Sequence, residues 1–218
     1  MTKQKADEQL VKLEQKISME TVDKMHKGII AIIESNEDNK LIQRQRFQEL
    51  LDRIPPKEVV KTHPYLRNVK YLPISYVEGL LDALFFAQWD TKNYKYLLIG
   101  NELSGDIEFS YQDPITKRER TLSGSAAVQI QVNALKENVK KNMKPEDVSR
   151  YALDLHNNKK PAALVGAIGT LKTDCIKNAA KSIGNAFGRN LNRDIKAVPF
   201  QILPTEYDKI KKVLDERK

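Results

Sequence analysis

The chain has 218 residues, of which 37 are Lys or Arg and 29 are Asp or Glu, so its formal net charge is +8. No apolar run approaches the ~20 residues of a membrane-spanning helix, and the single cysteine, Cys175, has no partner for an internal disulfide. Length and composition therefore argue against a membrane-spanning protein or a disulfide scaffold, and favour one soluble cytoplasmic domain with a polyanionic partner.

The positive charge is concentrated in one part of the chain. Residues 1–40 carry seven Lys against eight acids, whereas residues 159–196 carry eight Lys or Arg against two acids. Charge alone does not separate a nucleic-acid site from a solvated lysine surface, but the local excess marks where such a site would lie.

The first 60 residues are predicted to be an N-terminal helical segment. Residues 1–18 are highly charged and form either a frayed helix or a tail, and residues 19–35 have the apolar spacing of an amphipathic helix. Turn-forming residues end that helix at 35–39, and a third helix is expected at 40–53. Pro55 and Pro56 stop it, because proline lacks the backbone N–H and restricts the residue before it.

The middle of the chain is predicted to be a short helix followed by an antiparallel β-meander. Residues 57–73 read as a basic loop with interleaved aromatic side chains, and an apolar helix follows at about 80–87. Strand patterns occupy residues 94–100, 102–111 and 117–123. Alternation resumes at 128–132 after a small, flexible stretch at 123–127, so we expect three to four strands.

One long helix over residues 162–193 is predicted to lie across this sheet, after a polar insertion at 133–160. The predicted fold class is therefore α+β: an antiparallel β-meander packed on one long helix, with extra N-terminal helices. This divides the chain into the N-terminal segment 1–60, a core at 61–198, and a C-terminal tail with a short helix at 199–218.

The back of the predicted long helix is basic and carries glycines. At about 100° per residue, Lys177, Lys181, Gly184 and Gly188 fall opposite the apolar face, whereas Lys172 points into that face and must extend past it or meet another subunit. Each glycine costs about 1 kcal/mol of helix stability, so close approach by DNA, a strand or a subunit is expected there. The apolar face itself comprises Leu164, Val165, Ile168, Leu171, Cys175, Ile176, Ala179, Ala180, Ile183 and Phe187.

Several stretches carry a family resemblance. Residues 173–188 (TDCIKNAAKSIGNAFG) resemble the helix signature of the single-strand DNA annealing proteins, which comprise the eukaryotic Rad-type annealing and mediator proteins and the Sak-like phage annealases. Residues 74–79 (ISYVEG) are similar to the family's Tyr-x-Glu-Gly entry to its first core helix, and Trp89 stands near the family's tryptophan after that helix. The similarity covers roughly residues 65–193 and leaves residues 1–60 and 133–160 unmatched.

The resemblance implies a role in homologous recombination and DNA repair. It implies a β-β-β-α core that assembles into homo-oligomeric rings or helical filaments and holds single-stranded DNA in a basic groove. Complementary strands would pair through an annealing duplex intermediate without ATP or another cofactor, so the protein would not be an enzyme. A phage exonuclease or a single-strand-binding protein would be a further partner, and the host cytoplasm would be the location of a phage-encoded member.

The resemblance assigns the DNA backbone to Lys177 and, ahead of the Tyr-x-Glu-Gly stretch, to Arg67. Asn178 stands where the family often has a basic residue, which gives Lys181 more weight. Lys and Arg suit this role because they neutralise phosphates without reading sequence, and tyrosines add base stacking. The full set of candidate DNA-binding residues is Lys177, Lys181, Arg67, Lys70, Lys172, Arg189, Arg118, Arg120 and Tyr76.

Plainer interpretations of the same residues stay open. Lys177 and Lys181 also fit a solvated helix face, and Arg118 and Arg120 fit hairpin residues with no role. Trp89 fits a core residue better than a stacking platform. Further stacking candidates are Tyr65, Tyr71, Tyr94 and Tyr96, of which the last two, in a strand pattern, better fit core or interface tyrosines.

Three other functions compete with annealing. Asp106 and Glu108 alternate on one strand face as in a metal-dependent nuclease, but no nearby Lys completes a catalytic set, and the histidines lack metal-ligand spacing. A protein that coats single-stranded nucleic acid without pairing strands would use the same basic groove. A recombination scaffold that recruits an exonuclease or a single-strand-binding protein is the third alternative.

Overall fold

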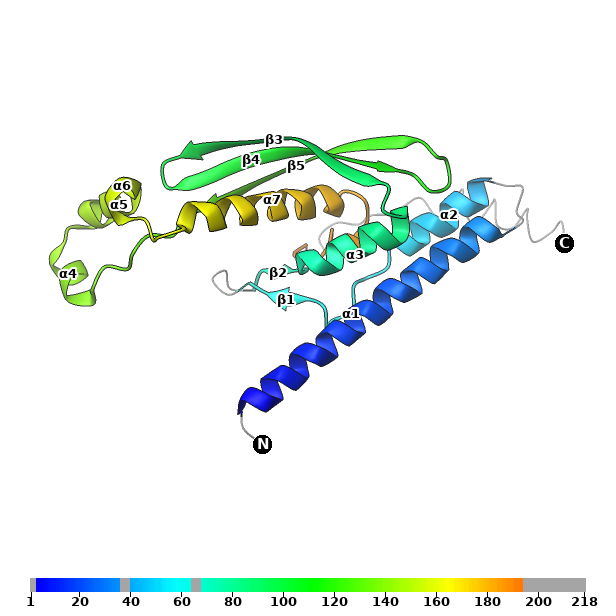
Figure 1. Cartoon of the computed structure of the whole chain (residues 1–218), viewed down its shortest axis with the longest axis horizontal. Helices are drawn as coiled ribbons and strands as arrows, with labels where there is room; N and C mark the ends of the chain where they lie inside the picture. Colours follow the sequence, from blue (N-terminus) through cyan, green and yellow to red (C-terminus); the bar gives the residue numbers. More distant parts are fainter. Residues whose placement is uncertain (1–2, 36–39, 64–67, 194–218) are drawn as a thin grey trace.

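The fold has two layers, a three-stranded antiparallel sheet above a layer of helices (Figure 1). The computed structural model describes residues 3–35, 40–63 and 68–193. The sheet has the order β3-β4-β5, built from Trp89–Ile99, Glu102–Gln112 and Glu119–Gln129. Helix α7 (Ala163–Lys181) lies against one face of the sheet with α3 (Ile74–Phe85) beside it, so the expected α+β fold is confirmed, with three strands.

Alternation along β4 decides which face of the sheet is covered. Leu103, Ile107 and Phe109 are each at most 2 % exposed, whereas Asp106 and Glu108 are exposed. The first set faces the helix layer, because period-two alternation places it on one side of the strand. The opposite face, which we call the outer sheet face, is open to solvent.

Glycines let α7 approach the sheet closely. A Cβ on Gly124 would lie 2.1 Å from the Cys175 carbonyl oxygen, and a Cβ on Gly105 would lie 2.9 Å from a Leu171 methyl carbon. Residues 123–127, expected to be flexible, are instead the middle of β5, where Gly124 and Ala126 face the helix and leave room for it to pack closely. The two predicted pieces on either side of them are one strand.

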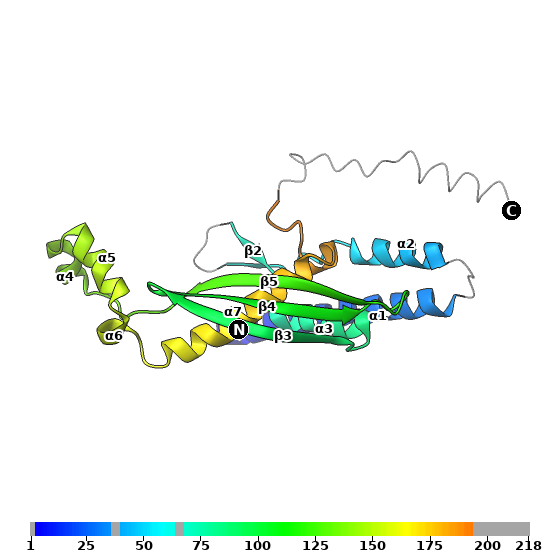
Figure 2. The ribbon, with the colours of Figure 1, turned by 90° about the horizontal axis from the view of Figure 1, so that it is seen from above.

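The first turns of α7 are less buried than expected. Val165 is 75 % exposed and Leu164 is 40 % exposed, although both belong to the predicted apolar face. The reason lies in how the helix crosses the sheet. α7 packs mainly on β4 and β5, and it runs beneath the sheet from the β3 side toward β5, so its first turns lie outside the main contact (Figure 2). The apolar stripe therefore continues past the body that covers it.

The single long helix predicted over residues 162–193 is wrong at both glycines. α7 ends at Lys181, and a short 3-10 helix, η1 (Asn185–Phe187), follows. Gly184 is extended, and a Cβ there would lie 2.5 Å from the Leu51 carbonyl oxygen, so the expected close approach is made by the chain's own N-terminal part. Gly188 has φ +84°, the left-handed region that glycine tolerates best.

The N-terminal helices share the core of the rest of the molecule. α1 (Lys3–Glu34) is one continuous helix and packs on α3, and α2 (Lys40–Leu51) packs on α1 and η1. Ile29, Phe47 and Leu50 are buried in one cluster with Phe85 and Phe187. The helices of residues 1–60 thus pack into the same core as the sheet. α3 starts six residues before the predicted helix, directly after Pro73, whose carbonyl oxygen accepts from the N–H groups of Tyr76 and Val77.

Two further pieces flank this body. Within the expected basic loop, β1 (Lys61–Thr62) and β2 (Lys70–Tyr71) pair antiparallel and lie below α7 in the view of Figure 1, on the helix side of the sheet. The polar insertion forms α4 (Glu137–Asn142), α5 (Pro145–Leu153) and α6 (Leu155–Asn158) near the start of α7 (Figure 1). The expected C-terminal tail helix lies outside the described residues. Within the described ranges, every helix is too short or too polar to cross a membrane.

Candidate nucleic-acid interface

Lys177 lies between α7 and the β1–β2 hairpin. Its Nζ is 2.6 Å from an Asp174 carboxylate oxygen and 5.4 Å from the centre of the Tyr71 ring. Only 18 % of the Lys177 side chain is exposed. The ammonium is therefore held by a carboxylate and an aromatic face, and Asp174 offsets its charge.

Lys181 follows one turn later and is half-buried. Its Nζ donates to Asn178 Oδ1 (2.9 Å), and Asn178 Nδ2 donates to the Ser125 carbonyl oxygen on β5 (2.8 Å). Burial, and then repulsion by Lys177, lower the pKa of Lys181, while Asp174 acts in the opposite direction. An anion placed beside Lys181 would offset both of the effects that lower its pKa.

After α7 the chain turns back and ties the hairpin to the helix end. Arg189 donates through Nε to the Lys181 carbonyl oxygen (3.0 Å) and through a second guanidinium nitrogen to that of Ser182, where a helix favours a cation. The Asn192 side chain accepts from the Lys70 N–H and donates to the Lys70 carbonyl oxygen, both at 2.7 Å. These contacts join Lys177, Lys181 and Arg189 with the backbone of Lys70, and we call these four residues the basic cluster.

Two of the predicted DNA-binding residues lie apart from the basic cluster. Lys172 is exposed and lies about 140° around α7 from Lys177, on the side where the helix is uncovered. Tyr76 is 3 % exposed, and burial raises its pKa to about 12. Because Tyr76 belongs to the core, it offers no ring to a base.

Three other arginines predicted to bind DNA, Arg67, Arg118 and Arg120, are not among the residues of the basic cluster. Arg118 and Arg120 are exposed at and just after the β4–β5 turn. Across the described ranges, no hydrogen bond or ion pair joins either of them to the basic cluster. Arg67, like Tyr65, lies outside the described residues, so its role stays a prediction.

Two aromatic side chains on β3 have structural partners. Trp89 stacks on Phe109 with ring centroids 5.7 Å apart, and its Nε1 donates to Asp82 (2.7 Å). The Tyr94 hydroxyl donates to the Ile168 carbonyl oxygen on α7 (3.1 Å). Both contacts match the packing interpretation of these residues.

The outer sheet face has the opposite charge. Its exposed charged residues come from all three strands, and acids outnumber lysines. The set is Asp90, Lys92, Lys95, Glu102, Asp106, Glu108 and Glu119. A polyanion is therefore expected to approach from the helix side of the sheet.

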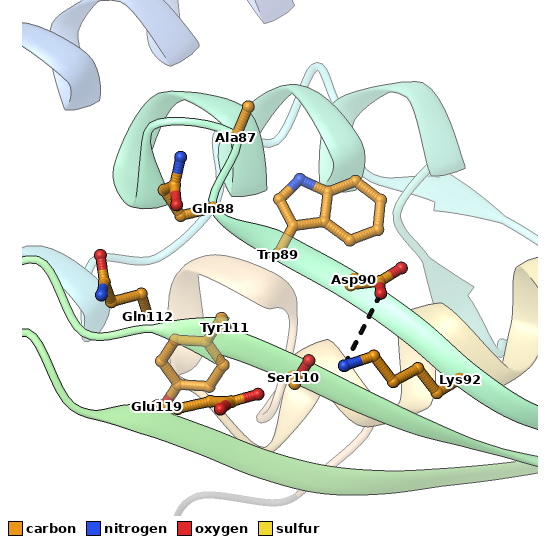
Figure 3. Close-up of a pocket in the computed structure, with 9 residues that line it drawn as sticks. All are labelled: Ala87, Gln88, Trp89, Asp90, Lys92, Ser110, Tyr111, Gln112 and Glu119. Atoms are coloured by element: carbon orange, nitrogen blue, oxygen red, sulfur yellow. Dashed lines mark ion pairs between the residues drawn. The ribbon is translucent and has the colours of Figure 1, made fainter.

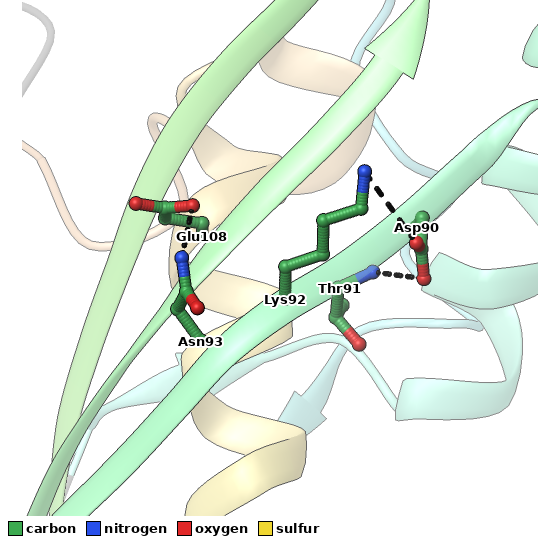
Figure 4. Close-up of polar contacts among 5 residues, drawn as sticks. All are labelled: Asp90, Thr91, Lys92, Asn93 and Glu108. Atoms are coloured by element: carbon green, nitrogen blue, oxygen red, sulfur yellow. Dashed lines mark hydrogen bonds and ion pairs between the residues drawn. The ribbon is translucent and has the colours of Figure 1, made fainter.

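The acids of the proposed nuclease alternative lie on this outer face. Asn93 Nδ2 donates to Glu108 Oε2 (2.7 Å), and Lys92 Nζ lies 4.0 Å from Asp90 Oδ2 (Figure 4). Lys92 stands opposite Glu108 and Lys95 opposite Asp106 in the strand register, so the expectation of no nearby Lys is wrong. Opposite charges facing each other across strands are an ordinary stabilising pattern of an exposed sheet face.

A shallow cavity of about 330 Å³ opens where β3 leaves α3. Its lining is mainly polar and lies at the β4–β5 turn end of the sheet, and Figure 3 shows the side chains around it. It is lined by Ala87, Gln88, Trp89, Asp90, Lys92, Ser110, Tyr111, Gln112 and Glu119. None of these residues belongs to the basic cluster.

Sequence reasoning missed the groups that hold the cluster in place. Asp174 precedes Lys177 by three residues, a spacing that predicts an ion pair on a helix. Asn192 and Lys70 are 122 residues apart, so no local pattern could have joined them. Asn178, noted only as a missing charge, bridges Lys181 to β5.

The chain matches no protein-family model and no curated protein.

Proposed function

We propose that this protein binds single-stranded DNA through the basic cluster and anneals complementary strands without ATP, acting as a homo-oligomer. The observation that carries the binding proposal is the gathering of Lys70, Lys177, Lys181 and Arg189 from three separate stretches on the side of the molecule away from the acidic outer sheet face. Opposed faces of this kind orient a polyanion on one side only.

The chemistry of the cluster suits a phosphate backbone. Ammonium and guanidinium groups neutralise phosphates and release counterions, and they leave base edges free to pair. Asn178 and Asn192 add amide groups beside the cations. Burial and Lys177 lower the pKa of Lys181, and a neighbouring phosphate would stabilise its charged form.

The pairing of strands rests on the resemblance of residues 173–188 to the annealing-protein signature. Binding and pairing are therefore tested separately. Acceleration of pairing between two labelled complementary oligonucleotides, without ATP, is the expected result for an annealing protein. Tight binding with no acceleration at any protein ratio would instead identify a coating protein.

The binding test compares salt dependence among single variants. For a labelled oligothymidylate, Lys177→Ala and Lys181→Ala should each lower the slope of log affinity against log salt by about 0.7, the value for one phosphate contact on a single strand. Asp174→Asn should strengthen binding, because it removes the carboxylate that competes for Lys177. Fluorescence anisotropy from low to high salt gives the slopes.

The matched control is Lys92→Ala, which removes an exposed lysine from the outer sheet face. Its slope should equal that of the unaltered protein. If Lys92→Ala and Lys181→Ala change the slope equally, DNA contacts are spread over the surface and the basic cluster is not the site.

A further inference from the structure

The end of the sheet that lies over the start of α7 exposes a group of large apolar side chains. Residues 96–99 of β3, with the sequence YLLI, are between 52 and 65 % exposed. Val165 on α7 is 75 % exposed, and the Tyr94 hydroxyl bond to Ile168 places the first turns of α7 under β3. An apolar group of this extent on a surface marks an interaction site.

β3 is an edge strand whose second half has the pattern of an interior strand. Its first half is interrupted by an irregularity between Lys92 and Lys95 and carries charges, which are features that protect an edge. In its second half Tyr96 and Leu98 face the helix side, while Leu97 and Ile99 face the outer side. A strand that is apolar on both faces is normally covered and paired on both sides.

β5, the opposite edge, offers a stretch of the same length at the same level. The register aligns Tyr96 with Gly105 and Ala126, and Ile99 with Glu102 and Gln129. Residues 126–129 (AAVQ) carry no charge. They lie between the Ser125 carbonyl, which is bonded to Asn178, and the Gln131 carbonyl, which is bonded to the Lys160 N–H.

Charged and uncharged residues are also distributed in the same order along the two edge strands. The charged start of β3 is level with the charged start of β5 (Glu119 and Arg120), and the uncharged ends are level with each other. β3 and β5 run parallel, because both are antiparallel to β4. If a second copy lies beside the first in the same orientation, the uncharged end of β3 in one copy therefore lies next to the uncharged end of β5 in the other.

We propose that β3 residues 96–99 of one copy dock on β5 residues 126–129 of the next, head to tail, with the exposed start of α7 in the same interface. Each added copy leaves one open β3 edge and one open β5 edge, so the contact builds a ring or a filament. The proposal names the surfaces of the homo-oligomer in the proposed function and rests on that part of it alone, not on DNA binding.

The test uses the full chain without DNA and measures mass by light scattering after size exclusion. The unaltered protein should form assemblies several times the 25.0 kDa of one chain, and Leu97→Lys and Ala127→Lys should each reduce them to single chains. Ile54→Lys is the matched control, because Ile54 is 77 % exposed elsewhere, and its mass should equal that of the unaltered protein. Far-ultraviolet circular dichroism confirms that each variant is folded.

Mixing the two variants distinguishes this contact from others. A Leu97→Lys copy keeps its β5 edge and an Ala127→Lys copy keeps its β3 edge, so the mixture should form a pair of chains and nothing larger. If Ala127→Lys keeps the mass of the unaltered protein, β3 pairs with something other than β5, and the proposal is overturned. A single-chain mass for the unaltered protein that still binds oligothymidylate overturns the assembly proposal and leaves DNA binding standing.

Discussion

At the scale of single residues, the basic cluster is defined by what surrounds each cation. Lys177 is paired with Asp174 and lies over Tyr71, whereas Lys181 is held by a neutral amide and repelled by Lys177. From the sequence alone, the two lysines are indistinguishable, because both lie on the same face of a predicted helix. Burial and repulsion by Lys177 lower the pKa of Lys181, so a bound anion would help to keep this lysine charged.

This difference predicts a pH effect on DNA binding. The pKa of Lys181 is lowered, so as pH rises Lys181 loses its proton before an ordinary lysine does, and oligothymidylate affinity should fall there. Lys181→Arg should remove this fall, since the guanidinium stays charged throughout. Anisotropy titrations between neutral and alkaline pH measure it. Parallel pH profiles for Lys181→Arg and the unaltered protein would contradict the role given to Lys181.

At the scale of elements, the contact between α7 and β5 is made possible by missing side chains. Gly124 lies under the Cys175 carbonyl, and Ala179 packs at the same place. Small residues such as those of SGSAA (123–127) are typical of loops, but here Gly124 and Ala126 form the surface on which a helix rests. The helix approaches closely enough for Asn178 to reach the Ser125 carbonyl.

Two glycine variants test this contact. Gly124→Ala should lower the free energy of unfolding by about 1–3 kcal/mol, because the new Cβ would lie 2.1 Å from a backbone oxygen. Gly169→Ala, within α7, is the control: nothing lies within 4 Å of its Cβ position, and helix propensity should stabilise it by up to about 1 kcal/mol. Urea unfolding midpoints give both values, and equal midpoints would mean that α7 does not rest on β5 as described.

At the scale of the whole molecule, the N-terminal helices and the sheet domain share one core. The buried cluster runs from Ile29 on α1 through Phe85 on α3 to Phe187 after α7. The chain after α7 is packed on this body, because Gly184 lies against Leu51 of α2. The position of the chain that carries Arg189 and Asn192 thus depends on a helix from the first quarter of the sequence.

We therefore expect a core change in α1 to affect the entire molecule. Ile29→Ala, at a residue with no exposed surface, should cost about 2–5 kcal/mol and lower the unfolding temperature of one cooperative transition. Ile54→Ala, which changes the same residue type at a 77 % exposed position, should stay within about 0.5 kcal/mol. Calorimetry reads both, and two separate transitions would show that residues 1–60 form an independent unit.

Local patterns in the amino-acid sequence are enough to predict the class of the fold and most of its elements. Period-two alternation along residues 102–111 and the apolar spacing around Leu171 and Cys175 report local burial, which is a property of the residues themselves. These patterns predicted the α+β class and the sheet-on-helix arrangement. The count of charged residues also shows an excess of Lys and Arg in residues 159–196, the stretch that contains Lys177, Lys181 and Arg189.

Tertiary structure decided where the helix ends, which apolar residues stay exposed, and which cations meet. The α7 helix ends at Lys181 because Gly184 must reach Leu51, and Val165 is exposed because the body beneath the sheet stops short of it. Tyr76 is buried and Lys70 is tied to Asn192 by contacts between distant segments. Such contacts leave no periodic trace in the sequence, since burial depends on partners that only the folded chain brings together.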